Sequence, residues 1–468
     1  MTPKSRNKCL EPSGVVGQTR GDPALNRARR HTVIFGLGIT GFSCIRFLRG
    51  TDRLTVIDTR PAPPFAESTR LQCPEVELIL GAPKPEHFVD ADRIVVSPGL
   101  RTSHCLLRRA VDRGVPLVSD IELFLDHAAA PVVGITGTNG KSTVTALTGE
   151  LLRAAGLDVG IGGNLGEAAL DLLQPNRDVY VLELSSFQLE RLNAGRFAIA
   201  ANLNVTPDHL DRYPDVGSYA ASKQRVFRGC DVAIYNRADP LTFPSTVFGR
   251  SESVGLDAPS KNSWGITEYA GRRYLGYADQ RFCAVDDLGI RGRHNEFNAM
   301  AAMALARAAG ADPASWNSTL GDFKGLGHRC QTVAIVAGIT FINDSKATNL
   351  GACLAALEGL GESRKHIVLI AGGDAKNADL SPLRETVARF VRHVVTLGKD
   401  AAAVEAAVAE AAPVHRVGSL RDAVAKSRAL ARGGDVVLLS PACASLDMFE
   451  NFEARGREFE SLVLELNQ

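Results

Sequence analysis

The sequence lacks several features that mark membrane, secreted and nucleic-acid-binding proteins. No run approaches the roughly 18 consecutive apolar residues that a membrane-spanning helix needs, and the basic N-terminus lacks the apolar stretch of a secretory signal. The nine cysteines form no CxxC pair, so neither a zinc site nor a disulfide framework is indicated. A formal net charge of +1 provides no overall positive field for nucleic acid or membrane. We therefore expect a cytoplasmic protein that binds small molecules.

What the sequence does contain is an alternation of short β-branched runs and helical patterns from end to end. Examples are TVIFGLG at 32–38, PVVGITG at 131–137 and HIVLIAGG at 366–373. This alternation is typical of α/β proteins with parallel sheets. At roughly 100 to 200 residues per domain, the length of 468 residues predicts three domains. We expect a disordered leader over 1–31, a first domain over 32–130, a central domain over 131–325 and a third domain over 326–468.

The strongest motif is GTNGKST at 137–143, which follows a buried strand and opens a helix. Such a loop turns backbone N–H groups toward a phosphate at the helix N-terminus. Lys141 can reach the terminal phosphates, and the hydroxyl of Ser142 can bind Mg²⁺. Ile135 stands where the standard spacing has glycine, so the loop is a variant, and a purely structural glycine turn is the alternative. The residues predicted to bind the nucleotide phosphates are Gly134, Thr136, Gly137, Thr138, Asn139, Gly140, Lys141, Ser142 and Thr143.

A second glycine pattern, GxGxxG at Gly36, Gly38 and Gly41, lies near the N-terminus, with Asp58 further along the chain. Alone it would indicate an NAD-linked oxidoreductase. That alternative leaves GTNGKST without a purpose, and any diphosphate benefits from a glycine turn at a helix N-terminus. A regulatory nucleotide-binding module is a further alternative, for which the segment SPACASLDMF at 440–449 would have no use.

Several motifs in a fixed order carry a resemblance to a known family. They are GTNGKST, GGNLG, VLELSSFQLE, LNVTPDHLDRY, RGRHNEFNA, NDSKATN, GGDAKNAD and SPACASLDMFENFEARG. Together they resemble the Mur ligase family, in its glutamate-adding branch, from about residue 32 to the C-terminus. Another Mur ligase or a folate polyglutamate ligase is the nearest alternative, but the DNPR-type signature expected of the former is absent from the sequence.

The resemblance implies an N-terminal Rossmann-like domain for a UDP-sugar, a central ATPase domain with a parallel sheet, and a C-terminal Rossmann-like lid. It implies an ATP-dependent ligase of peptidoglycan synthesis, which activates the carboxylate of UDP-N-acetylmuramoyl-L-alanine as an acyl phosphate and couples it to glutamate. The expected cofactors are ATP and Mg²⁺ at two sites. The expected partners are these small molecules, with no nucleic acid and no membrane, and the protein is expected to be a monomer.

The same resemblance assigns the catalytic and metal-binding side chains. Glu183 and Ser142 would bind one Mg²⁺, and His209 with a carbamylated Lys223 would bind the second. From the residues alone, Glu183 at the end of a strand could instead cap the next helix, His209 could be structural, and Lys223 would read as a solvated helix lysine. The catalytic residues implied are Lys141, His209, Lys223 and Lys346.

The remaining assignments concern the substrates. Asn295 and Asn298, three apart on a helix, face the same side and could hold adenine, although both could instead be helix caps. Arg329 and Asp344 would contact the nucleotide when the third domain closes. By resemblance the UDP-sugar residues are Ile39, Thr40, Asp58, Thr59, Arg60, Asn164 and Gln188, and the glutamate residues are Thr348, Lys376, Ser445, Leu446 and Phe452.

Three departures from the common family pattern bear on the amino acid. The leader is longer, Gly327 replaces a proline in GLPHR, and Ala375 replaces a glycine in GGDGK. Most of the family adds D-glutamate, whereas a subgroup adds L-glutamate. On resemblance, including the leader, we expect L-glutamate, with D-glutamate as the alternative. Enantiomers carry identical groups, so no motif separates them.

Overall fold

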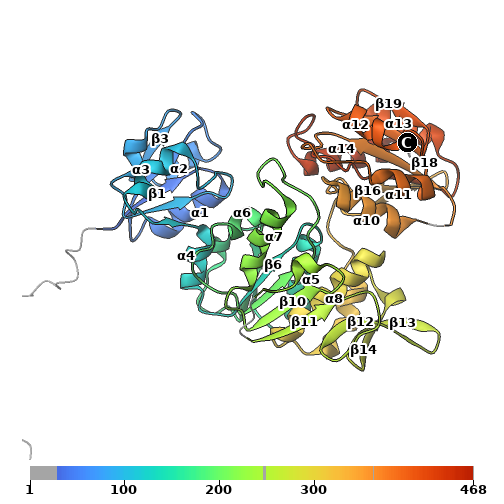
Figure 1. The fold of residues 1–468 in the computed structure, drawn as a ribbon, viewed down its shortest axis with the longest axis horizontal. Helices are drawn as coiled ribbons and strands as arrows, with labels where there is room; N and C mark the ends of the chain where they lie inside the picture. The colour runs from blue at the N-terminus through green and yellow to red at the C-terminus, as the bar shows by residue number, and fades with distance from the viewer. Residues whose placement is uncertain (1–28, 246–248, 362, 467–468) are drawn as a thin grey trace, which may run out of the picture.

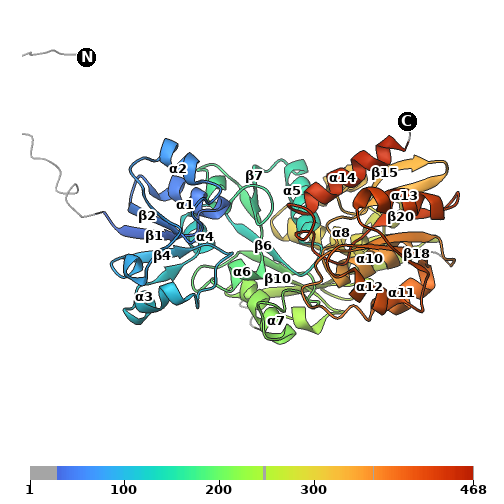
Figure 2. The ribbon, with the colours of Figure 1, turned by 90° about the horizontal axis from the view of Figure 1, so that it is seen from above.

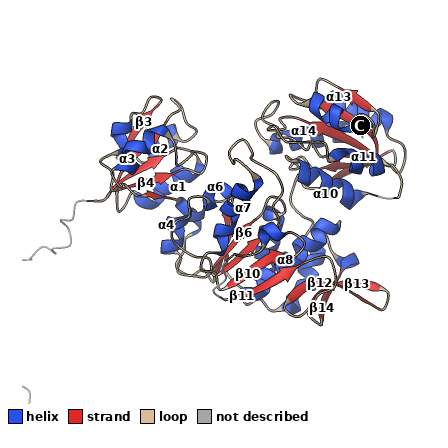
Figure 3. Cartoon of the chain, in the orientation of Figure 1, coloured by secondary structure: helices blue, strands red, loops and turns tan. Residues whose placement is uncertain are grey.

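The computed structural model describes residues 29–245, 249–361 and 363–466. Most of the leader expected over 1–31 lies outside these residues. The described chain forms three lobes, each with its own sheet (Figure 1). Seen from above, the lobes follow one another along the long axis in chain order (Figure 2), and helices surround the strands of each (Figure 3). The expected three-domain α/β fold is confirmed. In the described part, no helix is long and apolar enough to cross a membrane.

The N-terminal domain is a five-stranded sheet in the order β3-β2-β1-β4-β5, with all pairs parallel. Its strands are β1 (His31–Phe35), β2 (Arg53–Asp58), β3 (Glu77–Leu80), β4 (Arg93–Val96) and β5 (Leu117–Val118), and its helices are α1 (Ile39–Leu48), α2 (Ala66–Gln72) and α3 (Arg108–Asp112). The strand order reverses at β1, and in such sheets the crevice at the carboxyl ends next to the reversal receives the ligand. Helix α4 (Asp120–His127) leads into the central domain.

The central domain has a nine-stranded sheet in the order β14-β13-β12-β11-β10-β9-β6-β8-β7. The strands are β6 (Val132–Thr136), β7 (Val159–Gly163), β8 (Val179–Glu183), β9 (Ile199–Asn202), β10 (Val232–Asn236), β11 (Arg250–Val254), β12 (Ser263–Tyr269), β13 (Arg272–Tyr277) and β14 (Gln280–Ala284). The helices are α5 (Lys141–Ala154), α6 (Ser186–Leu189), α7 (Val216–Gln224), α8 (Arg293–Ala308) and α9 (Trp316–Asp322).

The central sheet is parallel, as expected, except at one end. Strand β13 pairs antiparallel with both β12 and β14, so the last strands form hairpins. The first hairpin turns at Ala270 and Gly271, which both have positive φ, as a tight two-residue hairpin turn requires. The parallel part, from β7 to β12, carries the phosphate loop.

The C-terminal domain is a six-stranded sheet in the order β15-β16-β20-β17-β18-β19, parallel except for the edge strand β15. Its strands are β15 (Gln331–Val336), β16 (Ile339–Asn343), β17 (Ile367–Gly372), β18 (Val391–Leu397), β19 (Val414–Arg416) and β20 (Val436–Leu439). Its helices are α10 (Leu350–Leu360), α11 (Leu383–Phe390), α12 (Ala401–Val408), α13 (Leu420–Leu430) and α14 (Phe452–Glu465). The domain boundaries expected at 131 and 326 fall between the sheets.

One apolar core spans the N-terminal and central domains, whereas the cores of the C-terminal domain lie within it. One buried cluster runs from β1 and α1 through α4 to the near face of the central sheet. Within it, the Phe124 ring of α4 contacts the Tyr180 ring of β8 edge to face, with centroids 5.0 Å apart. The two clusters of the C-terminal domain contain residues of that domain alone. The first two domains therefore share a core, whereas the third has its own.

Candidate active site

The sheet order brings the ends of three central strands together. Strands β9, β6 and β8 are neighbours, so their carboxyl ends meet at one edge of the sheet. The phosphate loop follows β6, Glu183 is the last residue of β8, and the segment with His209 follows β9. A parallel α/β sheet binds its ligands at this edge.

The phosphate loop is held in shape from behind. The N–H groups of Thr138 and Asn139 donate to the backbone oxygen and side-chain Oδ1 of Asn204, each at 2.8 Å. Gly140 is the N-cap of α5 with φ +82°, and a Cβ there would lie 2.5 Å from Asn298 Oδ1. The turn thus requires glycine both for its backbone angle and for space. It leaves the first N–H groups of α5 available for an anion.

Two residues assigned to this loop lie elsewhere. Gly134 is in the middle of β6, where a Cβ would lie 2.8 Å from the Phe197 ring. It is a packing glycine of the strand. Thr136 ends β6 and donates its hydroxyl to the backbone oxygen of Leu184 at 2.9 Å. Both support the loop rather than face the cavity.

Lys141 and Glu183 place opposite charges at the edge of the sheet. The Lys141 ammonium donates to the Thr138 carbonyl at 2.8 Å. Burial lowers the pKa of Lys141, and the Glu183 carboxylate opposes that shift in part. Burial alone would raise the pKa of Glu183. The charge of Lys141 and hydrogen bonding outweigh burial and hold the pKa of this carboxyl below its ordinary value. Glu183 is therefore ionised at neutral pH, and its charge favours the ammonium form of Lys141.

Only one of the two oxygens of the Glu183 carboxylate has a hydrogen-bond partner among the described residues. Its Oε1 accepts from Asn164 Nδ2 at 2.7 Å, whereas its buried Oε2 has no hydrogen-bond partner among the described residues. The alternative role as a helix cap is excluded, because Ser185 caps α6. A buried, unpaired carboxylate oxygen beside the Ser142 hydroxyl is a set of hard oxygen donors that suits Mg²⁺.

Lys223 is buried, not solvated as its sequence context alone would indicate. It is 1% exposed on α7, donates to the Gly137 carbonyl at 2.7 Å and lies 4.6 Å from the Tyr219 ring centre. Burial, followed by the charge of Lys141, lowers the pKa of Lys223 well below its ordinary value. A neutral amine is the form that reacts with CO₂, so this environment permits carbamylation.

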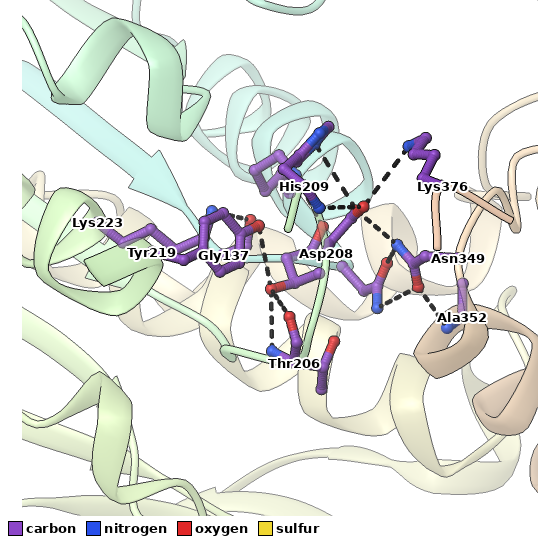
Figure 4. A network of polar contacts seen from close by, with 12 residues as sticks. Gly137, Thr206, Asp208, His209, Tyr219, Lys223, Asn349, Ala352 and Lys376 are labelled. Atoms are coloured by element: carbon purple, nitrogen blue, oxygen red, sulfur yellow. Dashed lines mark hydrogen bonds and ion pairs between the residues drawn. The ribbon is translucent and has the colours of Figure 1, made fainter. Parts of the chain in front are cut away.

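His209 lies beside Asp208 in a polar network that links two domains (Figure 4). Its Nε2 is 3.7 Å from Asp208 Oδ2, and burial lowers the pKa of His209 despite this carboxylate. Asp208 in turn lies 3.5 Å from Lys376 Nζ and accepts from Asn349 Nδ2 at 3.1 Å. Lys376 and Asn349 belong to the C-terminal domain.

The asparagine pair on α8 lies above the phosphate loop. Asn298 Nδ2 donates to Asn295 Oδ1 at 3.0 Å, so the two side chains face the same side as expected. The alternative role as caps is not observed, since Gly292 is the N-cap of α8 and no side chain caps it. Asn295 instead donates to the Arg291 carbonyl at 2.8 Å.

The C-terminal domain contributes cations and a buried acid. Arg329 donates to the Ser142 hydroxyl at 2.7 Å, directly across the boundary. Burial, then the charge of Arg329, lowers the pKa of Lys346 to about 8, and the Lys346 ammonium lies 3.8 Å from the Phe452 ring centre. Burial raises the pKa of Asp344 to about 7, although the Ser440 hydroxyl donates to it at 2.7 Å.

A cavity of about 640 Å³ lies between the central and C-terminal domains. Of the residues assigned from the sequence, it is lined by Thr138, Asn139, Gly140, Lys141, Ser142, Thr143, Asn164, Glu183, His209, Lys223, Asn295, Asn298, Arg329, Asp344, Lys346, Thr348 and Lys376. The residues that do not line it are Gly134, Thr136, Gly137, Gln188, Ser445, Leu446, Phe452 and the N-terminal group. Gln188 turns back to accept from the Ser185 N–H at 3.0 Å, Ser445 is buried, and Leu446 is 73% exposed.

The N-terminal group forms a separate, smaller arrangement. The buried Asp58 carboxylate accepts from the Leu37 N–H at 2.7 Å and from Arg60 at 2.7 and 2.9 Å. Burial opposes ionisation, but these bonds lower the pKa of Asp58. Asp58 thus ties β2 to the glycine turn before α1. Ile39, at the start of that helix, is 63% exposed and offers an apolar face, with Thr40 beside it and Thr59 following Asp58.

Sequence reasoning missed Asp208 and Asn349. Asp208 directly precedes His209 in the segment after β9, and a carboxylate beside a histidine is a recognisable signal. Asn349 opens α10 and accepts from the Ala352 N–H at 2.9 Å, so the sequence marks it only as a helix cap. No sequence pattern near Asn349 indicates its contacts with the central domain.

Comparison with known proteins supports these observations. Three family models match: a Mur ligase MurD-like N-terminal domain over 30–119, a Mur ligase middle domain over 135–306, and a Mur ligase glutamate ligase domain over 328–443. The UDP-N-acetylmuramoylalanine–D-glutamate ligase of Pseudomonas putida is 47% identical, over 91% of this chain and 96% of that protein. The ligase of the same name from Pseudomonas aeruginosa is 47% identical over 93% of this chain and 98% of that one.

Solved structures agree on the fold. The MurF ligase of Thermotoga maritima in complex with ADP superposes with a TM-score of 0.60 at 16% identity, covering 94% of this chain and 98% of that one. The MurC ligase of the same organism has a TM-score of 0.57 at 18% identity, covering 93% of this chain and 99% of that one.

Proposed function

The chain belongs to the Mur ligase family, as a MurD-type ATP-dependent ligase that forms an amide bond, and we propose that it couples UDP-N-acetylmuramoyl-L-alanine to D-glutamate. The observation that carries this proposal is the shared cavity, in which a phosphate loop faces the cationic side chains of a glutamate-ligase domain. A site for ATP and a site for a carboxylated amine thus open into one space.

The choice of D-glutamate replaces the expectation of L-glutamate. The relatives that match over most of the chain at 45 to 47% identity carry the D-glutamate name. The departures at Gly327 and Ala375 do not outweigh that similarity. Ala375 is buried, and its N–H donates to Asp400 Oδ2 at 2.8 Å, so its methyl group belongs to the packing of its own domain.

In the first step the alanyl carboxylate attacks the γ-phosphorus of ATP, the bond to the bridging oxygen breaks, and ADP leaves. Both reactants are anions, so positive charge must be concentrated between them. Lys141 lies at the phosphate loop, where the Glu183 carboxylate favours its ammonium form. Arg329 reaches the Ser142 hydroxyl from the other domain and adds a second cation.

The residues present fit Mg²⁺. Ser142 and Glu183, with its unpaired Oε2, would hold one ion, and His209 with carbamylated Lys223 would hold a second. Among the described residues no three His, Cys, Asp or Glu side chains form a ready-made cage, which agrees with an ion that keeps waters and phosphate oxygens. Bound Mg²⁺ would neutralise charge on the phosphates. Carbamylation joins the neutral Lys223 amine to the carbon of CO₂ and releases one proton.

In the second step the amine of glutamate attacks the acyl carbon and phosphate leaves. Positioning of this kind is worth roughly 7 to 11 kcal/mol of the barrier. Lys376 and Thr348, which line the cavity, would hold glutamate carboxylates, with Ser445, Leu446 and Phe452 shaping the far side of the pocket. Lys346 would neutralise charge that develops on the phosphate.

At the other end of the substrate, the N-terminal domain would hold the UDP group. The exposed Ile39 and the glycine turn tied to Asp58 offer an apolar face for uracil and N–H groups for the diphosphate. Asn164 would orient the muramoyl part near Glu183. The occupied Asp58 carboxylate is a poor acceptor for an NAD ribose, which disfavours the oxidoreductase alternative. We expect the enzyme to act as a monomer.

The test is to incubate the protein with ATP, Mg²⁺ and UDP-N-acetylmuramoyl-L-alanine, adding D- or L-glutamate separately. We expect phosphate release and a dipeptide product with D-glutamate. Product with L-glutamate instead would overturn the choice of enantiomer, and no product with either would overturn the proposed reaction.

A further inference from the structure

A pair of asparagine side chains joins the phosphate loop to the C-terminal domain. Asn139 lies in the loop between β6 and α5, and Asn349 directly precedes α10. Asn139 Nδ2 donates to Asn349 Oδ1 at 3.3 Å, and Asn349 Nδ2 donates back to Asn139 Oδ1 at 3.2 Å. Because each amide both donates and accepts, the pair orients the two side chains as well as joining them.

Each partner is fixed within its own domain. The Asn139 N–H donates to Asn204 Oδ1 at 2.8 Å, and Asn204 Nδ2 donates to the Asn139 carbonyl at 3.0 Å. Asn349 Oδ1 also accepts from the Ala352 N–H at 2.9 Å and so caps α10. The pair therefore joins the phosphate loop to the first turn of α10.

The same side chain reaches toward the proposed glutamate pocket. Asn349 Nδ2 donates to Asp208 Oδ2 at 3.1 Å, and Asp208 Oδ1 lies 3.5 Å from Lys376 Nζ (Figure 4). Lys376 is one of the residues proposed to hold a glutamate carboxylate. Asn349 is thus the point where contacts from the nucleotide loop and from the amino-acid pocket meet.

The backbone around this pair is packed closely. A Cβ on Gly351, in the first turn of α10, would lie 2.9 Å from Thr206 Oγ1 and 3.3 Å from Asn139 Nδ2. A side chain at position 351 would therefore force Thr206 or the helix to shift. The asparagine pair therefore lies in a tight contact between the two domains and not at an open surface.

We propose that Asn349 is a positioning residue for the second half of the reaction. Through Asn139 it sets the C-terminal domain, and with it glutamate, against the nucleotide site. This inference rests on the proposed function. Formation of the acyl phosphate uses the phosphate loop, the UDP-sugar and Arg329, whose bond to Ser142 joins the two domains without the pair. Capture of glutamate depends on Lys376, which the contacts of Asn349 and Asp208 position.

The decisive variant is Asn349→Ser, because serine keeps the helix cap but is too short to reach Asn139. Loss of the paired bonds should raise KM for glutamate about tenfold, with KM for ATP and UDP-sugar within about twofold of wild type. Acyl phosphate trapped with hydroxylamine in the absence of glutamate should form as in wild type. Ser419→Ala is the matched control, since it removes the cap of α13 in the same domain, where the Ser419 hydroxyl bonds Asp422 of its own helix.

A double-mutant comparison isolates the pair itself. If Asn349 acts through Asn139, the combination of Asn139→Ser with Asn349→Ser should raise KM for glutamate no more than the larger single change. Multiplied effects, or an unchanged KM in Asn349→Ser, would overturn the inference. Failure of the wild-type protein to make any glutamate-dependent product would instead refute the proposed function, so the two failures are distinguishable.

Discussion

The two domain boundaries of this protein are built in different ways. Between the N-terminal and central domains, one apolar core passes through α4 and includes the contact of Phe124 with Tyr180. Between the central and C-terminal domains lies the cavity that we propose as the reaction site, where polar bonds such as that from Arg329 to Ser142 join the two domains. The first boundary is part of a fold, whereas the second resembles a binding site, where relative motion of the domains is the normal expectation.

The apolar boundary also holds a short loop in place. Arg191, which is 3% exposed, donates to the Ser97 carbonyl at 2.5 Å, and Arg212 donates to the Pro98 carbonyl at 3.3 Å. Both arginines come from the central domain and both carbonyls from the N-terminal domain. The N-terminal domain, where we propose the UDP-sugar site, is thus joined to the central domain by these bonds as well as by the shared core.

The largest effect is expected at the polar boundary from Lys141→Ala. Removing the cation of the phosphate loop should reduce the coupling rate by about 10³-fold or more. The Kd for the UDP-sugar, measured by calorimetry, should remain within about twofold of wild type, because we propose that its UDP group binds to the N-terminal domain. Equal loss of binding and rate would show that the two boundaries are not independent.

The next largest effect should come from Phe124→Ala in the shared core. Truncation of a buried phenylalanine costs about 3 to 5 kcal/mol, and the loss should appear in a transition that unfolds the first two domains together. Calorimetric scanning of the full chain would separate this from the C-terminal domain. Leu71→Ala, at a position 75% exposed in the N-terminal domain, is the control. Separate melting of the N-terminal domain in the wild type would contradict a common core.

The stability of the boundary between the N-terminal and central domains should also depend on pH. Asp120, at the start of α4, is buried, and burial raises its pKa from 3.8 to about 6. A raised folded-state pKa adds stability that is present in full below pH ~4 and is lost as pH rises through about 6. Asp120→Asn should remove this loss and stabilise the protein at pH 8 by up to about 3 kcal/mol.

The measurement is the melting temperature of wild type and Asp120→Asn between pH 4 and 8. The two curves should diverge as pH rises. Asp126→Asn changes an exposed aspartate of the same helix and serves as the control. Parallel curves for wild type and Asp120→Asn would mean that ionisation of this buried carboxyl does not lower the stability of the protein.

The smallest effect is expected from Arg101→Ala. Arg101 donates to the Asp211 carbonyl at 3.1 Å, across the same boundary as Phe124 but at the surface. An exposed contact of this kind contributes less than about 0.5 kcal/mol. A loss comparable to that of Phe124→Ala, measured by urea unfolding, would show that polar contacts and not the shared core hold the first two domains together.

The parts of the site that the sequence predicted are those with local signatures. The phosphate loop was recognisable because strand, glycines, lysine and helix are consecutive. The hairpins of β12 to β14 were not separated from the parallel pattern, since short alternating runs look alike in both. Gly134 could not be distinguished from a loop glycine, because the reason for it is the Phe197 ring, which lies far along the chain.

Contacts between domains were beyond such reasoning. Asn349 lies 210 residues from Asn139 and 141 from Asp208, and docking of separate sheets brings them together. No periodicity relates such positions. Family resemblance supplied Lys223 and His209, but only the fold shows that Lys223 is buried and that Asp208 joins both sides.

The glycine at position 351 has a practical consequence. A Cβ at this position of α10 would lie 2.9 Å from the Thr206 hydroxyl. A small molecule that placed a single methyl group there would act as a wedge and hold the third domain away from the nucleotide. An inhibitor of this enzyme could therefore block closure without imitating ATP, the sugar nucleotide or the amino acid.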